Sequence, residues 1–155
     1  MGLDMYMYRD NYVKNWEHTA PERRHEIIIK KGGEVVTDID TEKISHITEE
    51  VAYWRKFNAL HNWIVNRCAH GRDECQEIYV SSEDLAELYD ILKKVSSNHS
   101  LAEELLPTTS GFFFGSEEYD DYYFDEVNRT IEIFRPYVQE MAKGYNSDFS
   151  YQASW

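Results

Sequence analysis

Apolar and polar side chains alternate from Leu3 to Tyr8, and this pattern constrains the fold more than any other stretch of the chain. Leu3, Met5 and Met7 fall on one face of an extended strand, because successive side chains of a β-strand point to opposite sides. A strand with one apolar face needs paired neighbours and a layer that covers this face. The pattern therefore predicts a sheet with helices packed on one side.

Two further segments have the composition of a hairpin and of a long helix. Residues 25–37 predict the hairpin, because a β-branched run is followed by a turn with two glycines and by a second β-branched run. The first long helix is expected from about Glu49 to Arg67, with Thr48 as its N-cap.

The second half of the chain predicts one more strand and two more helices. Residues 76–80 predict a short strand, and Ser81 has the position of an N-cap for the second helix. The apolar stripe of this helix consists of Leu85, Leu88, Leu92 and Val95. The phenylalanine run at 111–115 is either a buried strand or a loop. Ser116 is expected to cap a third helix, which Pro136 kinks or ends.

This order of elements predicts an α+β fold, with a small, mostly antiparallel sheet and about three helices packed on it. The chain has 155 residues, three prolines and no internal repeat, which favours one domain. We expect residues 1–143 to form this domain and residues 144–155 to be a loose tail.

The net charge of −13 argues against direct binding to nucleic acid or to anionic membranes. Most of the negative charge belongs to residues 81–126, which contain 12 acids and two lysines and therefore carry a net charge of −10. Two interpretations of this segment stay open. It is either a surface that keeps the protein soluble or an acidic protein-binding surface that mimics nucleic acid.

The start of the chain has no basic region followed by an apolar run, and no apolar stretch approaches the length of a membrane helix. Tyr6 stands where a myristoylation motif requires serine or threonine. These features predict a cytoplasmic protein without a membrane partner, in which Cys68 and Cys75 stay reduced.

His61 lies in the middle of the apolar arc of the predicted first helix, beside Trp54, Phe57 and Ile64. It is either a core histidine with a hydrogen-bond partner or a histidine at the base of a pocket, where it contacts a ligand or acts as a general base.

A polar row lies next to this arc on the same helical wheel. Its members are Arg55, Asn58, Asn62 and Asn66. Neutral donors and acceptors beside one fixed cation suit a polar or anionic ligand. The alternative is a partly hydrated helix face that packs beside a polar loop.

The loop from Pro107 to Ser116 has two glycines and three hydroxyl side chains before the expected helix at Ser116. A loop that meets a helix N-terminus favours anion binding, although the acids that follow oppose a phosphate. Thr108 and Ser110 of this loop, and Tyr119 just after it, are candidate ligand contacts.

Metal and cofactor motifs are absent from the sequence. Cys68, His70 and Cys75 lack the second pair that a zinc site requires, so we expect free thiols. No catalytic or nucleotide-binding motif occurs either. We therefore predict no metal, no cofactor and no assigned catalytic residue.

Three segments stand out as a set: Met1–Tyr6, Tyr53–Trp63 and Leu105–Ser116, with Tyr119-Asp120 shortly after the last. Together they resemble a family of small uncharacterised phage, prophage and bacterial proteins that start Met-Gly-Leu-Asp-Met-Tyr. The resemblance spans residue 1 to about residue 135. It implies a phage or prophage setting, and it carries over no catalytic or binding residue.

These observations predict an accessory protein that binds a polar or anionic small ligand, such as a nucleotide-like signal, or a host protein. The expected ligand site consists of Arg55, Asn58, His61, Asn62, Asn66, Thr108, Ser110 and Tyr119. The alternative function is an acidic inhibitor that mimics nucleic acid. A small enzyme is the third option, with His61 as the base and Asp4 or Tyr119 brought to it by the fold.

Overall fold

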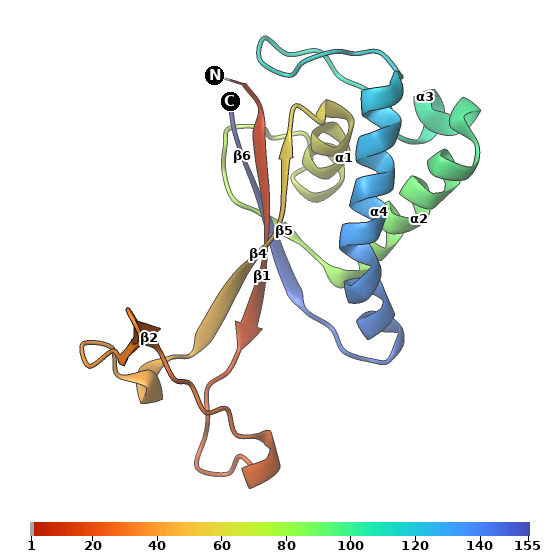
Figure 1. The fold of residues 1–155 in the computed structure, drawn as a ribbon. Coiled ribbons are helices and arrows are strands. Elements are labelled where there is room, and N and C mark those ends of the chain that lie inside the picture. Colours follow the sequence, from red (N-terminus) through yellow and green to blue (C-terminus); the bar gives the residue numbers. More distant parts are fainter. Residues whose placement is uncertain (1) are drawn as a thin grey trace.

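The alternating segment forms strand β1 (Asp4–Tyr12), which lies inside a four-stranded sheet (Figure 1). The structure is a computed structural model, and it describes residues 2–155. The strand order is β4 (His46–Arg55), β1, β6 (Asp148–Ser154), β5 (Ile78–Val80), and every neighbouring pair is antiparallel.

Helices cover one face of this sheet (Figure 1). They are α1 (Asn58–Cys68), α2 (Ser82–Ser97), the single turn α3 (Ala102–Leu105) and α4 (Asp121–Ala142). The predicted α+β class with a mostly antiparallel sheet is confirmed, with four helices in the described residues instead of about three. The additional helix is the short α3, which precedes Pro107.

The core lies between the sheet and the helices. β1 contributes Met5 and Met7, which are fully buried, as their alternation predicts. Ser81 caps α2 by accepting a hydrogen bond from the backbone N–H of Asp84, as expected. The apolar stripe of α2 is also fully buried, and it consists of Leu85, Leu88, Leu92 and Val95.

The predicted helix from Glu49 to Arg67 is wrong in its first part, because His46–Arg55 is strand β4. Thr48, the expected N-cap, lies within this strand opposite Asp10. Glutamate and alanine at 49–52 favour a helix locally, but pairing with β1 overrides this weak preference. The strand buries Ala52 and Trp54 and exposes the residues between and after them.

The expected loose tail is also wrong. Residues 148–154 form β6, which pairs with β1 on one side and with β5 on the other. Its inward side chains Phe149, Tyr151 and Ala153 are buried. Ser150 and Gln152 separate these apolar residues, and this short alternation has the period of a half-buried strand.

Helix α4 begins later and runs further than predicted. Its N-cap is Asp120, whose side chain accepts from the backbone N–H of Tyr123, while Ser116 stays in the loop. Pro136 lies inside the helix and does not end it. The turn beyond this proline still packs on the core through Tyr137 and Val138, which favours its continuation. The phenylalanine run before the helix forms a turn and not a strand.

Helix α4 also caps the outer edge of β4. The backbone carbonyl of Tyr53 accepts a hydrogen bond from the Arg129 guanidinium at 2.9 Å, and that of Arg55 accepts one from the Tyr122 hydroxyl. The backbone N–H of Lys56 donates to the Leu3 carbonyl, so residues 3 and 56 form a hydrogen-bonded pair. Such pairs alternate along antiparallel strands, and the carbonyls of Tyr53 and Arg55 therefore face away from β1. This end of the edge strand therefore has little free backbone for another strand.

Residues 13–45, which connect β1 to β4, extend away from the body of the molecule (Figure 1). We call them the arm. They include two short 3-10 turns and a hairpin of β2 (Lys30–Lys31) and β3 (Glu34–Val35). The hairpin predicted at 25–37 is therefore confirmed, although its strands are shorter than expected.

Candidate functional site

His61 is sealed in the core, at 2% relative exposure, and both of its ring nitrogens are bonded. Nδ1 lies 2.6 Å from the Tyr151 hydroxyl, and Nε2 lies 2.9 Å from Oδ2 of Asp73. In a neutral ring, Nε2–H donates to the carboxylate and Nδ1 accepts from the hydroxyl. Neither Asp4 nor Tyr119, the partners expected for a catalytic role, makes these bonds.

This geometry leaves His61 no access to a substrate, because a general base must reach the proton that it removes. Burial raises the pKa of Tyr151 well above its ordinary value, and the negative charge of Asp73 raises it further. The hydroxyl thus stays protonated as a donor. The Trp155 indole donates to the second Asp73 oxygen at 3.2 Å, so this network joins α1 to β6.

Asn58 has a structural role at the start of α1. Its amide nitrogen donates to the carbonyls of Phe114 and Ser116, and its amide oxygen accepts from the backbone N–H of Thr109. The side chain is buried, and these three bonds fix the loop that follows α3. Asn58 and this loop do come together, as the sequence suggests, but they satisfy one another.

Two other loop candidates are also engaged. The backbone N–H of Thr108 donates to the Tyr119 hydroxyl at 3.2 Å, and the Thr108 hydroxyl donates to the Glu117 carbonyl. The small hollow beneath this loop, which Asn58 and Thr108 line, measures about 20 Å³. This volume is about that of a single water molecule, so the hollow does not fit a nucleotide. Ser110 is exposed on the loop.

The remaining predicted residues do not converge on one cleft. Asn66 donates to Asn62 at 2.9 Å on the surface of α1. Arg55 lies in β4 and alternates with the buried Trp54, so it points away from the helices and from His61. It lies 3.5 Å from Asp4, which also accepts from the Tyr53 hydroxyl. The wheel that grouped Arg55 with the asparagines treated a strand as a helix.

The face of the sheet opposite the helices carries a row of tyrosines. We call it the open face. Alternation along β1 places Tyr6 and Tyr8 on it, with Tyr53 of β4 beside them. The rings of Tyr6 and Tyr8 are stacked with centroids 6.4 Å apart, and those of Tyr6 and Tyr53 are 5.2 Å apart. Tyr79 of β5 is exposed on the same side.

A groove of about 580 Å³ crosses this face. Its lining residues come from all four strands and from the segment before β5. They are Tyr8, Asp10, Thr48, Glu77, Tyr79, Asp148, Phe149, Ser150 and Gln152. Three of them are acids and none is lysine, arginine or histidine. The groove is therefore acidic and partly aromatic, and sequence reasoning missed it.

Two tyrosine hydroxyls of the groove are held in the protonated state by their surroundings. Burial raises the pKa of Tyr8, and the negative charge of Glu50 adds to the shift. Burial raises the pKa of Tyr79 as well, together with the charge of Asp148, which accepts a hydrogen bond from it at 3.2 Å. Asp10 lies 3.8 Å from His46 and accepts from the Thr48 hydroxyl.

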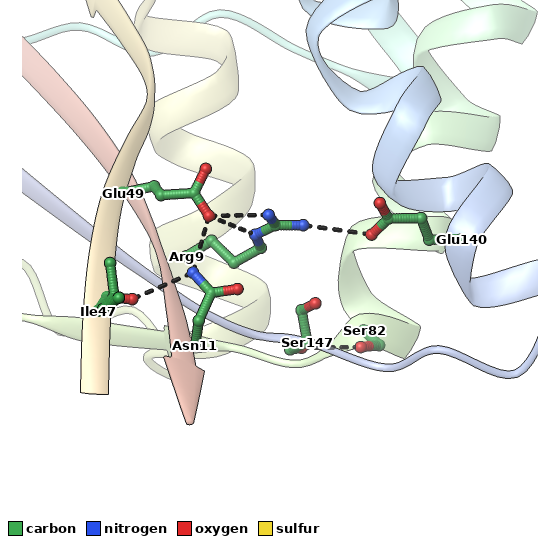
Figure 2. Close-up of polar contacts among 7 residues, drawn as sticks. All are labelled: Arg9, Asn11, Ile47, Glu49, Ser82, Glu140 and Ser147. Carbon is green, nitrogen blue, oxygen red and sulfur yellow. Dashed lines mark hydrogen bonds and ion pairs between the residues drawn. The ribbon is translucent and has the colours of Figure 1, made fainter. Parts of the chain in front are cut away.

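A second polar cluster lies on the side of β1 and β4 that faces the helices (Figure 2). Figure 2 shows Arg9 of β1 between Glu49 of β4 and Glu140 of α4. The Arg9 guanidinium lies 2.7 Å from a carboxylate oxygen of Glu49 and 3.2 Å from one of Glu140. The amide nitrogen of Asn11 also donates to Glu49, at 2.7 Å. The Arg9 guanidinium lies over the ring of Tyr137. The positive charge of Arg9 faces both glutamates, so the cluster holds β1 and β4 against α4.

Candidate metal and thiol chemistry is limited in this chain. No group of three or more histidine, cysteine or acidic side chains in residues 2–155 has a geometry that could hold a metal ion. Both cysteines are free. Burial raises the pKa of the Cys68 thiol to about 12, and the neighbouring Asp84 adds to the shift. Of the described helices, none combines the length and apolar character that crossing a bilayer requires.

Comparisons with protein-family models, with curated proteins and with solved structures find no match.

Proposed function

We propose that this protein is a non-enzymatic binding protein that holds a positively charged segment of a partner protein on its open face. The observation that carries the proposal is the groove, which combines three carboxylates with the rings of Tyr8 and Tyr79 and has no basic lining residue. Carboxylates attract lysine and arginine, and tyrosine rings bind the same cations through their faces. Tyrosine is also enriched at protein interfaces.

The magnitudes favour a polypeptide over a single small cation. An exposed ion pair contributes about 0.2–1 kcal/mol and an exposed cation–π contact about 0.5–1 kcal/mol. One cation in the groove therefore gains little. A segment with several basic residues adds such contacts together and gains apolar contact with the tyrosine rings. The expected binding is weak to moderate and falls as salt screens the charges.

The two other functions suggested by the sequence have less geometric support. A small anionic ligand at Asn58 and His61 would have to displace bonds that both side chains already make. Within residues 81–126, several acids are paired, as Asp84 and Glu87 are with Arg67. This pairing suits a solubilising surface more than a mimic of nucleic acid. The phage or prophage setting stays a prediction.

The test is a titration with a fluorescently labelled peptide rich in lysine and arginine, followed by polarisation at low and at high salt. The variant Asp10→Asn with Asp148→Asn keeps the hydrogen-bonding shape of the groove but removes two charges, and it should weaken binding about tenfold, or about 1.4 kcal/mol. The matched control is Glu103→Gln with Glu104→Gln on α3, which changes the net charge by the same amount but lies outside the groove. This control should bind the peptide as the unaltered protein does. Equal loss in both variants would show that net charge alone attracts the peptide.

A further inference from the structure

The arm buries almost nothing within its own chain. Among residues 13–45, all of which the structure describes, only Val13 is buried. Ordering a residue costs about 1–2 kcal/mol of backbone entropy, and burial of apolar surface is the main compensation. The arm has hydrogen bonds instead, such as the pair between Asn15 and the backbone of His25. These hydrogen bonds hold the backbone of the arm, but its apolar side chains are not buried by the remainder of the chain.

Exposed aliphatic side chains concentrate on the arm. The large aliphatic residues that are exposed in the described chain are Ile28, Val35, Ile39 and Ile47. The first three belong to the arm, and Ile47 lies where β4 leaves it. Ile28 is 65% exposed and Val35 is 61% exposed. Exposed apolar surface gathered on one projecting element is typical of an interaction surface.

The charges of the arm divide along the sequence into two halves of opposite sign, and the hairpin holds these halves side by side, with Lys31 of β2 paired opposite Glu34 of β3. Residues 14–31 carry five bases and three acids, a net charge of +2, and residues 32–45 carry four acids and one base, a net charge of −3. None of these side chains forms an ion pair within the chain across 13–45, which the structure describes in full. The arm is nearly neutral overall, whereas the remainder of the chain carries a net charge of −12.

We propose that two copies of this chain associate through their arms as a two-fold dimer, with the positive half of each arm facing the negative half of the other. A two-fold axis brings the same surface of both copies together, so a surface on which a basic strand lies beside an acidic strand complements itself. The arm is also the surface on which two such acidic molecules meet with least repulsion. Ile28, Val35 and Ile39 lose their exposed surface at this interface, and the groove on the open face stays free for its own partner.

The first test is the mass of the full chain in solution, measured by sedimentation velocity up to about 100 µM, a concentration that populates a dimer of micromolar Kd. We expect a concentration-dependent dimer. Ile28→Asp and Val35→Asp should each weaken it about tenfold or more, because they place a charge in the apolar centre of the interface. Phe112→Asp is the control, since Phe112 is 96% exposed but lies outside the arm. A chain that stays monomeric, or a dimer that only Phe112→Asp dissociates, would overturn the proposal.

The second test exploits the two halves directly. Lys30→Glu with Lys31→Glu makes both halves of one arm negative, and Glu34→Lys with Asp38→Lys makes both halves of another arm positive. Each variant alone should be monomeric, because like charges then face each other. An equimolar mixture should form a heterodimer, which only direct contact between the two halves explains. Two monomers in the mixture would refute the arrangement, and peptide binding at the groove is independent of either result.

Discussion

The hydrogen bond between Tyr151 and His61 makes a sharp prediction about stability. Tyr151→Phe removes only the hydroxyl and leaves the aromatic ring in place. The Nδ1 atom of His61 then stays buried without its partner at 2.6 Å. A buried polar atom without a hydrogen bond costs about 1–3 kcal/mol, because in the unfolded chain water satisfies it.

We therefore expect Tyr151→Phe to lower the free energy of unfolding by about 2 kcal/mol. For a domain of this size, this corresponds to a decrease of roughly 4–8 °C in Tm. Urea and thermal unfolding followed by circular dichroism measure both quantities. Hydrogen exchange should show the loss first in β5 and β6, because the bond joins β6 to α1.

Two further variants make the reasoning refutable. Tyr145→Phe removes a hydroxyl from an exposed ring and should change stability by less than about 0.5 kcal/mol. The double variant Tyr151→Phe with His61→Leu removes both partners, so it should be less destabilising than the sum of the single variants by about 1 kcal/mol. A Tyr151→Phe variant as stable as the unaltered protein, or strict additivity in the double variant, would show that the bond does not stabilise the fold.

Two other changes test polar contacts described above, those of Asn58 with the loop after α3 and those of Glu49 with Arg9 and Asn11. Asn58→Ala should lower the free energy of unfolding by about 1–3 kcal/mol and open the loop after α3 to proteolysis, because three hydrogen bonds are lost. Asn66→Ala on the exposed surface of α1 is the control. Equal proteolysis of both variants would contradict the role of Asn58. Hydrogen bonds from Arg9 and Asn11 lower the pKa of Glu49, so its stabilising contribution should be complete above the ordinary glutamate pKa and be lost as pH falls through the lowered value. Carboxyl titration by NMR, compared with an Arg9→Gln variant, checks this shift, and an unchanged Glu49 pKa in that variant would contradict it.

The parts of the fold with a clear local period could be predicted from the sequence. Alternation from Leu3 to Tyr8 placed Met5 and Met7 in the core correctly. The stripe of α2 and its cap at Ser81 were also correct, because these signals depend only on neighbouring residues. The α+β class followed from the order of such segments.

Two segments were wrong for physical reasons. The stretch 49–55 contains good helix formers, and only its pairing with β1, 40 or more residues earlier, makes it a strand. Residues 148–154 have a weak local pattern, and their place between β1 and β5 is decided by distant partners. Local propensity reports neither interaction.

The candidate site shows the same division. Alternation along β1 was enough to place Tyr6 and Tyr8 on the face opposite Met5 and Met7. The groove needs Asp10 and Asp148 side by side, and these residues meet only because β6 pairs with β1. His61 was placed correctly in an apolar environment, but Asp73 and Tyr151, which decide its role, lie outside its helix.

The place of β6 has a consequence for how the chain folds during synthesis. β6 lies between β1 and β5, so Met5 pairs with Ala153 across nearly the whole length of the chain. β5 has no strand partner until residues 148–154 have left the ribosome. Such distant pairing raises the contact order and slows folding. While synthesis proceeds, the exposed edges of β1 and β5 lack their partner, and the nascent chain is then most vulnerable to aggregation and to chaperone capture.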